Sequence, residues 1–208
     1  MEQVLDVYKR PYSISNPVVC MDESPKQMIK DTRLPIKMKE GREAKYDHEY
    51  ERCGVCNIFM SCEPLRGKRY VEITERRTKK DWAMFVKNIS DVYYKDADKI
   101  TLVMDNLNTH FPASLYETFE PDEAKRIWDR FEFVYTPKHG SWLDMAEIEL
   151  KVLHSQCLSR RIDNIEEVRR QALAWQKHRN NKNAKVNWQF KNEDARIKLK
   201  RLYPTIEA

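Results

Sequence analysis

The sequence predicts a single α/β domain in which a β-sheet packs against helices. Short apolar runs typical of buried strands alternate with segments that carry apolar residues every three or four positions. A chain of 208 residues can form one hydrophobic core, and 41% hydrophobic residues with five tryptophans argue against disorder. No apolar run approaches the roughly 20 residues of a membrane span, and no signal peptide opens the chain.

The strands are predicted from apolar runs that end at turn-forming residues. Pro and Gly in Glu63–Gly67 favour a turn between two paired strands. Ile100–Met104 is a continuous apolar run, which is typical of a strand that is buried on both faces. The five predicted strands are Val18–Met21, 53–62, 68–74, Ile100–Met104 and Phe131–Tyr135.

Capping residues followed by an apolar stripe predict the main helices. Thr78 and Asp81 form a capping box at the start of the first helix. A second helix is predicted over 141–158, with Ser141 as its N-cap and Asp144 three residues later. The apolar faces are Trp82, Phe85, Val86, Ile89 and Tyr93 for the first helix, and Ile165, Val168, Ala172 and Trp175 for a third helix capped within Asp163–Glu166.

Five cysteines are an odd number in a chain without a secretory signal, so disulfides are not expected. Cys53 and Cys56 have the spacing of metal ligands. A structural zinc needs two more ligands, and the remaining candidates do not form a paired motif. We therefore interpret residues 53–62 as a buried strand.

Three acidic residues stand where their side chains can converge. Asp22 and Asp105 each follow an apolar strand, and Glu147 lies on the polar stripe of the helix over 141–158. A partly buried carboxylate is costly unless a cation lies beside it, and an oxygen-rich cage suits Mg²⁺. Singly, each residue has a structural explanation as a strand exit or a surface glutamate. Together they favour a site for two metal ions, as used to cut and join phosphodiesters.

The chain resembles the DDE transposases of the Tc/mariner-like bacterial insertion sequences over nearly its whole length. The matching stretches are Val18–Ser24 (VVCMDES), Val103–His110 (VMDNLNTH) and Tyr135–Glu147 (YTPKHGSWLDMAE), with a further match in the tail at Trp188–Phe190, Asp194–Arg196 and Leu202–Pro204. The third stretch is the most specific because it is long and in the expected order.

The resemblance implies an RNase H-like mixed central sheet flanked by helices. It implies Asp22, Asp105 and Glu147 as the catalytic residues and metal ligands for two Mg²⁺ ions, with Mn²⁺ as a substitute. The expected organisation is an N-terminal linker over 1–16, the catalytic domain over 17–184, and a tail over 185–208 that packs on or extends that domain.

Two departures from the family pattern leave alternatives open. The spacing from Asp105 to Glu147 is longer than usual, and residues 120–130 read as a short inserted helix that explains the excess. Position 144 is Asp where the family suggests Asn, so a fourth carboxylate is expected beside the site. Glu149 is a rival to Glu147, although two residues apart on a helix they point to different faces.

Basic residues favour a polyanionic partner, since the net charge is +5. The candidates for contact with DNA phosphates are Lys138 and His139, in the loop before the helix that carries Glu147, and the cluster Arg76, Arg77, Lys79 and Lys80. A solvated surface is the alternative for each cluster. Asn106 and His110 flank Asp105 and are candidates for orienting the metal ligands, with a capped loop as the alternative.

The expected function is that of a transposase catalytic domain. Metal-dependent cleavage at transposon ends would free a 3′-hydroxyl, which would then attack target DNA. The expected partners are transposon-end and target DNA and a second copy in an active homodimer, in the nucleoid of a bacterial cytoplasm. The alternatives are an RNase H-type nuclease that cuts without joining, and a non-catalytic DNA-binding or assembly protein derived from a transposase. The helix-turn-helix region usual in the family is not visible before the first strand, so little base-specific binding is expected.

Overall fold

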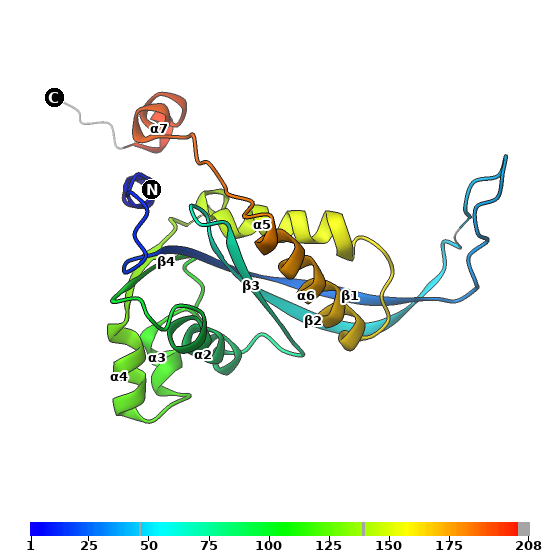
Figure 1. The fold of residues 1–208 in the computed structure, drawn as a ribbon, viewed down its shortest axis with the longest axis horizontal. Helices are drawn as coiled ribbons and strands as arrows, with labels where there is room; N and C mark the ends of the chain where they lie inside the picture. Colours follow the sequence, from blue (N-terminus) through cyan, green and yellow to red (C-terminus); the bar gives the residue numbers. More distant parts are fainter. Residues whose placement is uncertain (46, 139, 204–208) are drawn as a thin grey trace.

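A five-stranded mixed sheet forms the centre of the computed structural model, which describes residues 1–45, 47–138 and 140–203. The strand order is β3-β2-β1-β4-β5 (Figure 1). The strands are β1 (Val18–Asp31), β2 (Tyr50–Glu63), β3 (Lys68–Thr74), β4 (Ile100–Met104) and β5 (Phe131–Tyr135). The first three pair antiparallel, whereas β1, β4 and β5 pair in parallel. The predicted RNase H-like mixed sheet is therefore confirmed.

Strand β1 is much longer than the predicted Val18–Met21. It continues to Asp31 because β2 pairs with it along its whole second half, up to the pair Asp31↔Tyr50. On its other side β1 pairs with β4 only over Val18–Cys20, so Pro25 lies where no neighbour needs its missing N–H. Asp22 consequently lies within a strand, and the prediction that it ends one is wrong.

Helices cover both faces of the sheet (Figure 1). On one face of the sheet, every second residue of β1 and β4 packs against α2 (Lys79–Asn88). Val19 of β1 and Trp82 of α2 belong to the same hydrophobic cluster. The opposite face of β2 and β3 packs against α5 (Met145–Leu153) and α6 (Ile165–Asn181). The capping box of Thr78 and Asp81 is confirmed, as are both predicted apolar faces.

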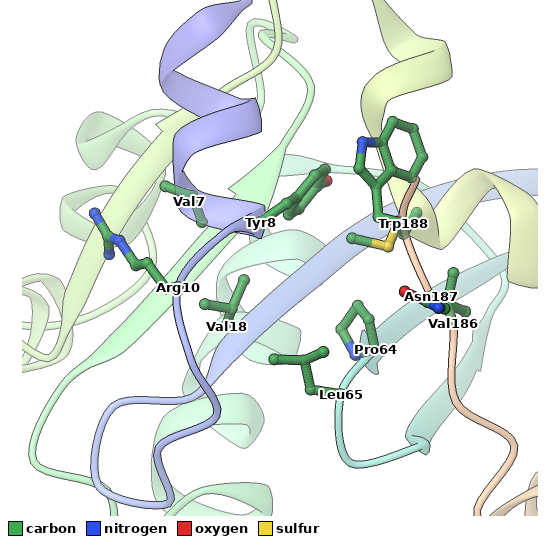
Figure 2. A pocket seen from close by; sticks show the side chains of 10 residues that line it. Val7, Tyr8, Arg10, Val18, Pro64, Leu65, Val186, Asn187 and Trp188 are labelled. Atoms are coloured by element: carbon green, nitrogen blue, oxygen red, sulfur yellow. The ribbon is translucent and has the colours of Figure 1, made fainter. Parts of the chain in front are cut away.

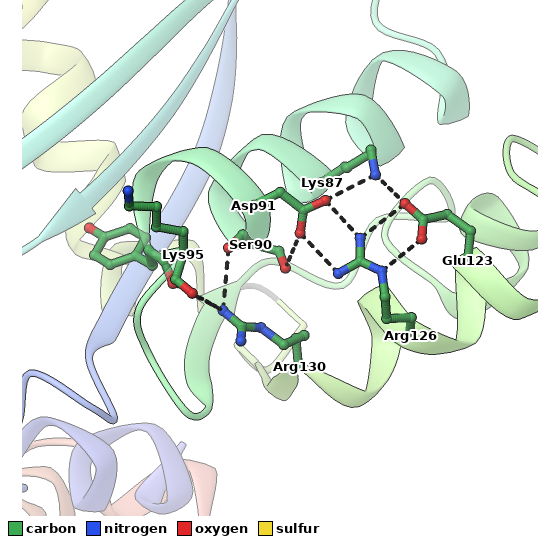
Figure 3. Close-up of polar contacts among 8 residues, drawn as sticks. Lys87, Ser90, Asp91, Lys95, Glu123, Arg126 and Arg130 are labelled. Atoms are coloured by element: carbon green, nitrogen blue, oxygen red, sulfur yellow. Dashed lines mark hydrogen bonds and ion pairs between the residues drawn. The ribbon is translucent and has the colours of Figure 1, made fainter.

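The predicted inserted helix over 120–130 is confirmed as α4 (Pro121–Asp129), which follows a short α3 (Pro112–Tyr116) that was not predicted. Figure 3 shows the polar network that joins α4 to α2 and to the π-helical turn η1 (Ile89–Tyr93) that continues α2. Arg126 Nη2 lies 2.7 Å from Asp91 Oδ2, and Lys87 contacts both Asp91 and Glu123. The insertion is thus fixed to the body of the domain.

Both ends of the described chain pack on the domain. Helix α1 (Glu2–Tyr8) buries Val4, Leu5 and Val7, and the ring of Tyr8 lies 5.3 Å from that of Trp188. Residues of α1, of the turn after β2 and of the 186–188 segment line a pocket (Figure 2). Its volume is about 60 Å³. The described lining of this cavity does not include any of the three candidate carboxylates, so we regard it as a packing feature.

A last helix, α7 (Asn192–Lys198), follows this segment, and its Arg196 pairs with Glu2 of α1. Within the described residues, no helix combines the length and apolar character required to cross a membrane.

Candidate active site

Asp22 and Asp105 lie level with each other on neighbouring strands. Cys20 pairs with Val103 in the parallel ladder, so two residues further along each chain bring Asp22 of β1 beside Asp105, which directly follows β4. The position of Asp105 at a strand end is confirmed. Because β4 stops and β1 continues, the Asp22 side chain projects from the sheet where the neighbouring strand gives way to the 105–110 loop.

Electrostatics support the proximity of the three carboxylates. Burial raises the pKa of Asp22 to about 7, and the charges of Glu23, Asp105 and Glu147 act in the same direction. The main-chain N–H of Glu23 donates to Asp22 Oδ1 at 2.8 Å, which lowers the pKa but does not offset the rise. Repulsion within a group of like charges is relieved when a cation binds among them.

Glu147 lies in the first turn of α5, which packs against β1. The predicted helix over 141–158 is divided into a 3₁₀ turn at Ser141–Leu143, α5 itself, and a π-helical turn at His154–Leu158. The prediction that Ser141 is the N-cap is wrong. Asp144 takes this role, since its Oδ1 accepts a hydrogen bond from Ala146 N at 2.8 Å.

Asp144 is 1% exposed, and burial raises its pKa well above the usual range, with the charges of Cys20 and Asp22 acting in the same direction. Its Oδ2 is buried and has no hydrogen-bond partner within the described chain. Asp144 therefore caps α5 through Oδ1, while its second carboxylate oxygen is left without a partner among the described residues.

The rival glutamate, Glu149, is committed to a buried ion pair. Arg69 donates to both of its carboxylate oxygens at 2.6 Å, and Arg179 contacts the same carboxylate at 3.2 Å. The Arg69 and Glu149 side chains are 1% and 2% exposed. This bidentate pair links α5 to β3 and α6, and it leaves Glu147 as the glutamate of α5 with an oxygen free for another ligand.

The carboxylate oxygens of Asp22, Asp105 and Glu147 are of the kind that bind a divalent cation. They are not arranged as a coordination sphere in this structure. Among the described residues, no three His, Cys, Asp or Glu side chains form an arrangement that could hold a metal ion as it stands. Glu147 Oε1 lies 2.8 Å from Lys151 Nζ, while its Oε2 is buried without a hydrogen-bond partner in the described chain. Lys151 is 74% exposed, so its ammonium group can move away at little cost when a metal binds.

His110 lies beside Asp105, as its position in the sequence suggested. Its Nδ1 is 2.7 Å from Asp105 Oδ1, and its Nε2 is 3.2 Å from Oε2 of Glu23. Burial lowers the pKa of His110, but the close carboxylates of Asp105 and Glu23 outweigh this effect and raise it to about 9. The imidazole is therefore positively charged at neutral pH.

A cleft of about 350 Å³ opens beside Asp105. Its described lining includes Asn106 and Lys138, both of which are exposed. Asn106 therefore faces the cleft next to the carboxylates, and Lys138 places a positive charge at its wall. His139, the other residue predicted in this loop to contact DNA, lies outside the described residues.

The predicted basic cluster follows β3 and leads into α2. Its four members are Arg76, Arg77, Lys79 and Lys80, and all are exposed. Arg77 Nη1 lies 3.7 Å from Glu23 Oε1, and Lys79 pairs with Glu117 at 2.7 Å. Among the described residues, Arg76 and Lys80 form no ion pair. The Arg77 contact places one end of the cluster next to the residue that follows Asp22.

The strand order and the placement of Asp22 on β1 beside Asp105, directly after β4, agree with the class of fold that the sequence resemblance implies. A family model described as "DDE superfamily endonuclease" matches residues 17–169, and the chain belongs to this family. No curated protein sequence matches the chain significantly.

Solved structures of a mariner transposase share the fold. The Mos1 mariner paired-end complex with Mn has a TM-score of 0.57 at 16% identity, over 88% of this chain and 54% of that one. The Mos1 paired-end complex with left transposon end gives 0.56 at 16% identity, over 84% and 51%. A pre-cleavage Mos1 transpososome gives 0.54 at 14% identity, over 90% and 61%. The chain thus spans little more than half the length of the first of these proteins.

Glu23 and Arg69 are the residues of the site region whose importance the sequence analysis missed. Glu23 was considered only as part of the stretch Val18–Ser24, yet its side chain is 1% exposed. One signal was available: in a strand that continues beyond Asp22, Glu23 must point to the opposite face, which is covered by α2. No local signal pairs Arg69 with Glu149, since 80 residues separate them.

Proposed function

We propose that this chain is the catalytic domain of a DNA transposase, which cleaves DNA at transposon ends and joins the freed 3′-hydroxyl to target DNA. The observation that supports the proposal is the mutual charge effect of Asp22 on β1, Asp105 directly after β4 and Glu147 on α5, in a chain of the DDE superfamily endonuclease family. These residues are proposed to be the catalytic residues and the ligands of two Mg²⁺ ions, which Mn²⁺ can replace.

When bound, the divalent ions would polarise the scissile phosphate and lower the pKa of the attacking hydroxyl. Asp22 and Asp105 would hold them at the sheet, and Glu147 would close the site from α5 after releasing Lys151. Lys138 and Asn106, in the adjacent cleft, would contact the DNA backbone and orient it across the carboxylates. No general base from the protein is required in this arrangement.

The substrate is proposed to be duplex DNA, held in part by Arg76, Arg77, Lys79 and Lys80 beside the site. A homodimer is the proposed active assembly. It is supported by the exposed apolar side chains of the segment between β1 and β2, where Leu34 is 95% and Met38 is 75% exposed. Action on DNA would place the protein at the bacterial nucleoid.

A cleavage and joining assay on labelled terminal-repeat DNA tests the proposal. Wild-type protein should nick the DNA only with Mg²⁺ or Mn²⁺, and should transfer the labelled 3′ end to a target plasmid. Asp105→Asn should lose both products while retaining the wild-type circular dichroism spectrum. Cutting without joining would favour the RNase H-type alternative, and binding without either reaction would favour a non-catalytic protein.

A further inference from the structure

Glu23 is a buried carboxylate that the proposed reaction does not use. It follows Asp22 on β1, so its side chain points to the opposite face of the sheet, where Met21 packs in one cluster with Trp82 of α2. Both of its oxygens are buried and lack an aligned hydrogen bond within the described chain. Its two charged contacts are His110 Nε2 at 3.2 Å and Arg77 Nη1 at 3.7 Å.

The ring and the main chain of His110 are both fixed by contacts with neighbouring residues. Its ring, which is fully buried, stacks on Trp82 with centroids 5.6 Å apart and an interplanar angle of 24°. Its main-chain N–H donates to Leu107 O at 2.9 Å, and its carbonyl oxygen accepts from Tyr135 Oη at 2.8 Å. Because backbone and ring are both fixed, His110 presents its two nitrogens in constant directions.

The two ring nitrogens contact two different carboxylates, Glu23 and Asp105, next to the end of β4. Nε2 faces Glu23, while Nδ1 lies 2.7 Å from Asp105 Oδ1 and 3.2 Å from the main-chain oxygen of the same residue. One carboxylate oxygen of Asp105, Oδ1, is thus in contact with the imidazole, and the other, Oδ2, is not engaged by it.

We propose that His110 and Glu23 are positioning residues for metal binding. His110 fixes the rotamer of Asp105, and Glu23 acts only through His110 by fixing the ring. This inference rests on the proposed function, since it assigns Asp105 as a metal ligand. It adds a residue on the far face of the sheet, Glu23, that does not contact the metal or the DNA.

The test measures metal affinity without DNA or catalysis. Thermal unfolding of the whole chain is followed while MgCl₂ or MnCl₂ is titrated. The apparent dissociation constant fitted to the rise in melting temperature, called the metal midpoint below, is compared between variants. His110→Ala should raise this midpoint about 10–100-fold, the usual effect of losing a partner that orients a ligand. His110→Asn, which can still donate to Asp105, should recover part of the loss.

The double variant decides whether Glu23 acts through His110. Glu23→Gln should raise the metal midpoint in the wild-type background, but it should have no further effect in His110→Ala. Glu63→Gln is the matched control. It also neutralises a buried carboxylate on the sheet, 2% exposed, but it lies four residues along β2 from the partner of Glu23, and its metal midpoint should stay unchanged.

Two outcomes would overturn the inference while leaving the proposed function intact. One is an unchanged metal midpoint in both His110 variants, and the other is an additive effect of Glu23→Gln and His110→Ala. If the wild type shows neither a metal-dependent rise in melting temperature nor cleavage, the proposed function and this inference both fail. If His110→Ala is unfolded before metal is added, His110→Asn takes its place. The change in the metal midpoint of His110→Asn is smaller, but it must still exceed that of Glu63→Gln.

Discussion

At the scale of single residues, the two glutamates of α5 have opposite roles although they are two positions apart. The charge of Glu147 acts on Asp22, and among the described residues its ion-pair partner is the exposed Lys151. Glu149 is buried against Arg69 and Arg179. Removing one partner of a buried ion pair leaves an uncompensated charge, whereas removing an exposed pair has little effect.

We therefore expect Glu147→Gln to abolish cleavage without lowering the melting temperature of the metal-free protein. Glu149→Gln should destabilise the fold by about 3–5 kcal/mol, because the buried Arg69 loses its counter-charge. Cleavage assays and chemical denaturation of both variants check this pair. If cleavage persists in Glu147→Gln and is lost in a fully folded Glu149→Gln, the catalytic glutamate is Glu149 and not Glu147.

The pKa of Asp22 predicts how stability depends on pH without metal. Its folded-state pKa of about 7 is above the unfolded value of 3.8, so the stabilisation is complete below pH 3.8 and is lost as pH rises through 7. His110, raised from 6.5 to about 9, loses its contribution at higher pH, between those values. The metal-free protein should therefore melt several degrees lower at pH 7.5 than at pH 5.5.

Asp22→Asn should flatten the part of this profile between pH 4 and 7 while leaving the decline toward pH 9. Saturating Mg²⁺ should raise the melting temperature of the wild type most at pH 7.5, where the carboxylates are ionised. Thermal melts at fixed ionic strength provide the measurement. A wild-type melting temperature that rises from pH 5.5 to 7.5 in EDTA would contradict the clustered carboxylates.

At the scale of elements, α5 depends on how it begins. The helix starts at Met145 rather than near Ser141 because the buried Asp144 side chain caps it, while a 3₁₀ turn buries Leu143 in front of it. Both Asp and Asn have an oxygen that can accept from the main chain at an N-cap. The carboxylate charge of Asp144 is consequently not needed for this role.

Asp144→Asn should keep wild-type stability at pH 7 and retain cleavage, because Asn preserves the cap and carries no charge to bury. Asp144→Ala should cost about 1 kcal/mol or more through loss of the cap. Urea denaturation of both variants checks the difference. If Asp144→Asn instead weakens Mg²⁺ binding as strongly as Asp105→Asn, the residue is a metal ligand in its own right.

At the scale of the whole molecule, the end of β4 sets where DNA can approach. Lys138 and the basic cluster after β3 lie toward the carboxylates. Lys95 and Lys99 precede β4 and so lie toward its other end, and both are exposed. Charge near the site should therefore matter more for DNA binding than charge at the opposite end of the strand.

Charge reversal of Arg76 and Lys80 together should weaken DNA binding about equally for transposon-end and scrambled duplexes, and should reduce the slope of log affinity against log salt. The matched control is Lys95→Glu with Lys99→Glu, which makes the same change in net charge. Fluorescence anisotropy at two salt concentrations gives both quantities. If both double variants lose the same DNA affinity, the cluster contributes only through net charge. If the wild type binds transposon-end DNA tightly and specifically, base recognition lies within these residues.

Local chemistry determined much of this protein from the sequence alone. The mostly apolar run Ile100–Met104 and the capping box at Thr78 and Asp81 needed no distant partner, so both are found as predicted. The strands 68–74 and Phe131–Tyr135 follow from the same kind of pattern. The assignment of Asp105 to the end of a strand and of Glu147 to a helix was also readable, because each motif is local.

Contacts between distant parts of the chain decided the rest. Residues 22–31 extend β1 because β2 supplies hydrogen-bond partners along it, which no local pattern around Pro25 indicates. The same extension turns Glu23 into the buried core, where His110, 87 residues later, becomes its partner. Burial and pairing depend on which elements meet, so the separate roles of Glu147 and Glu149 became apparent only in the tertiary structure.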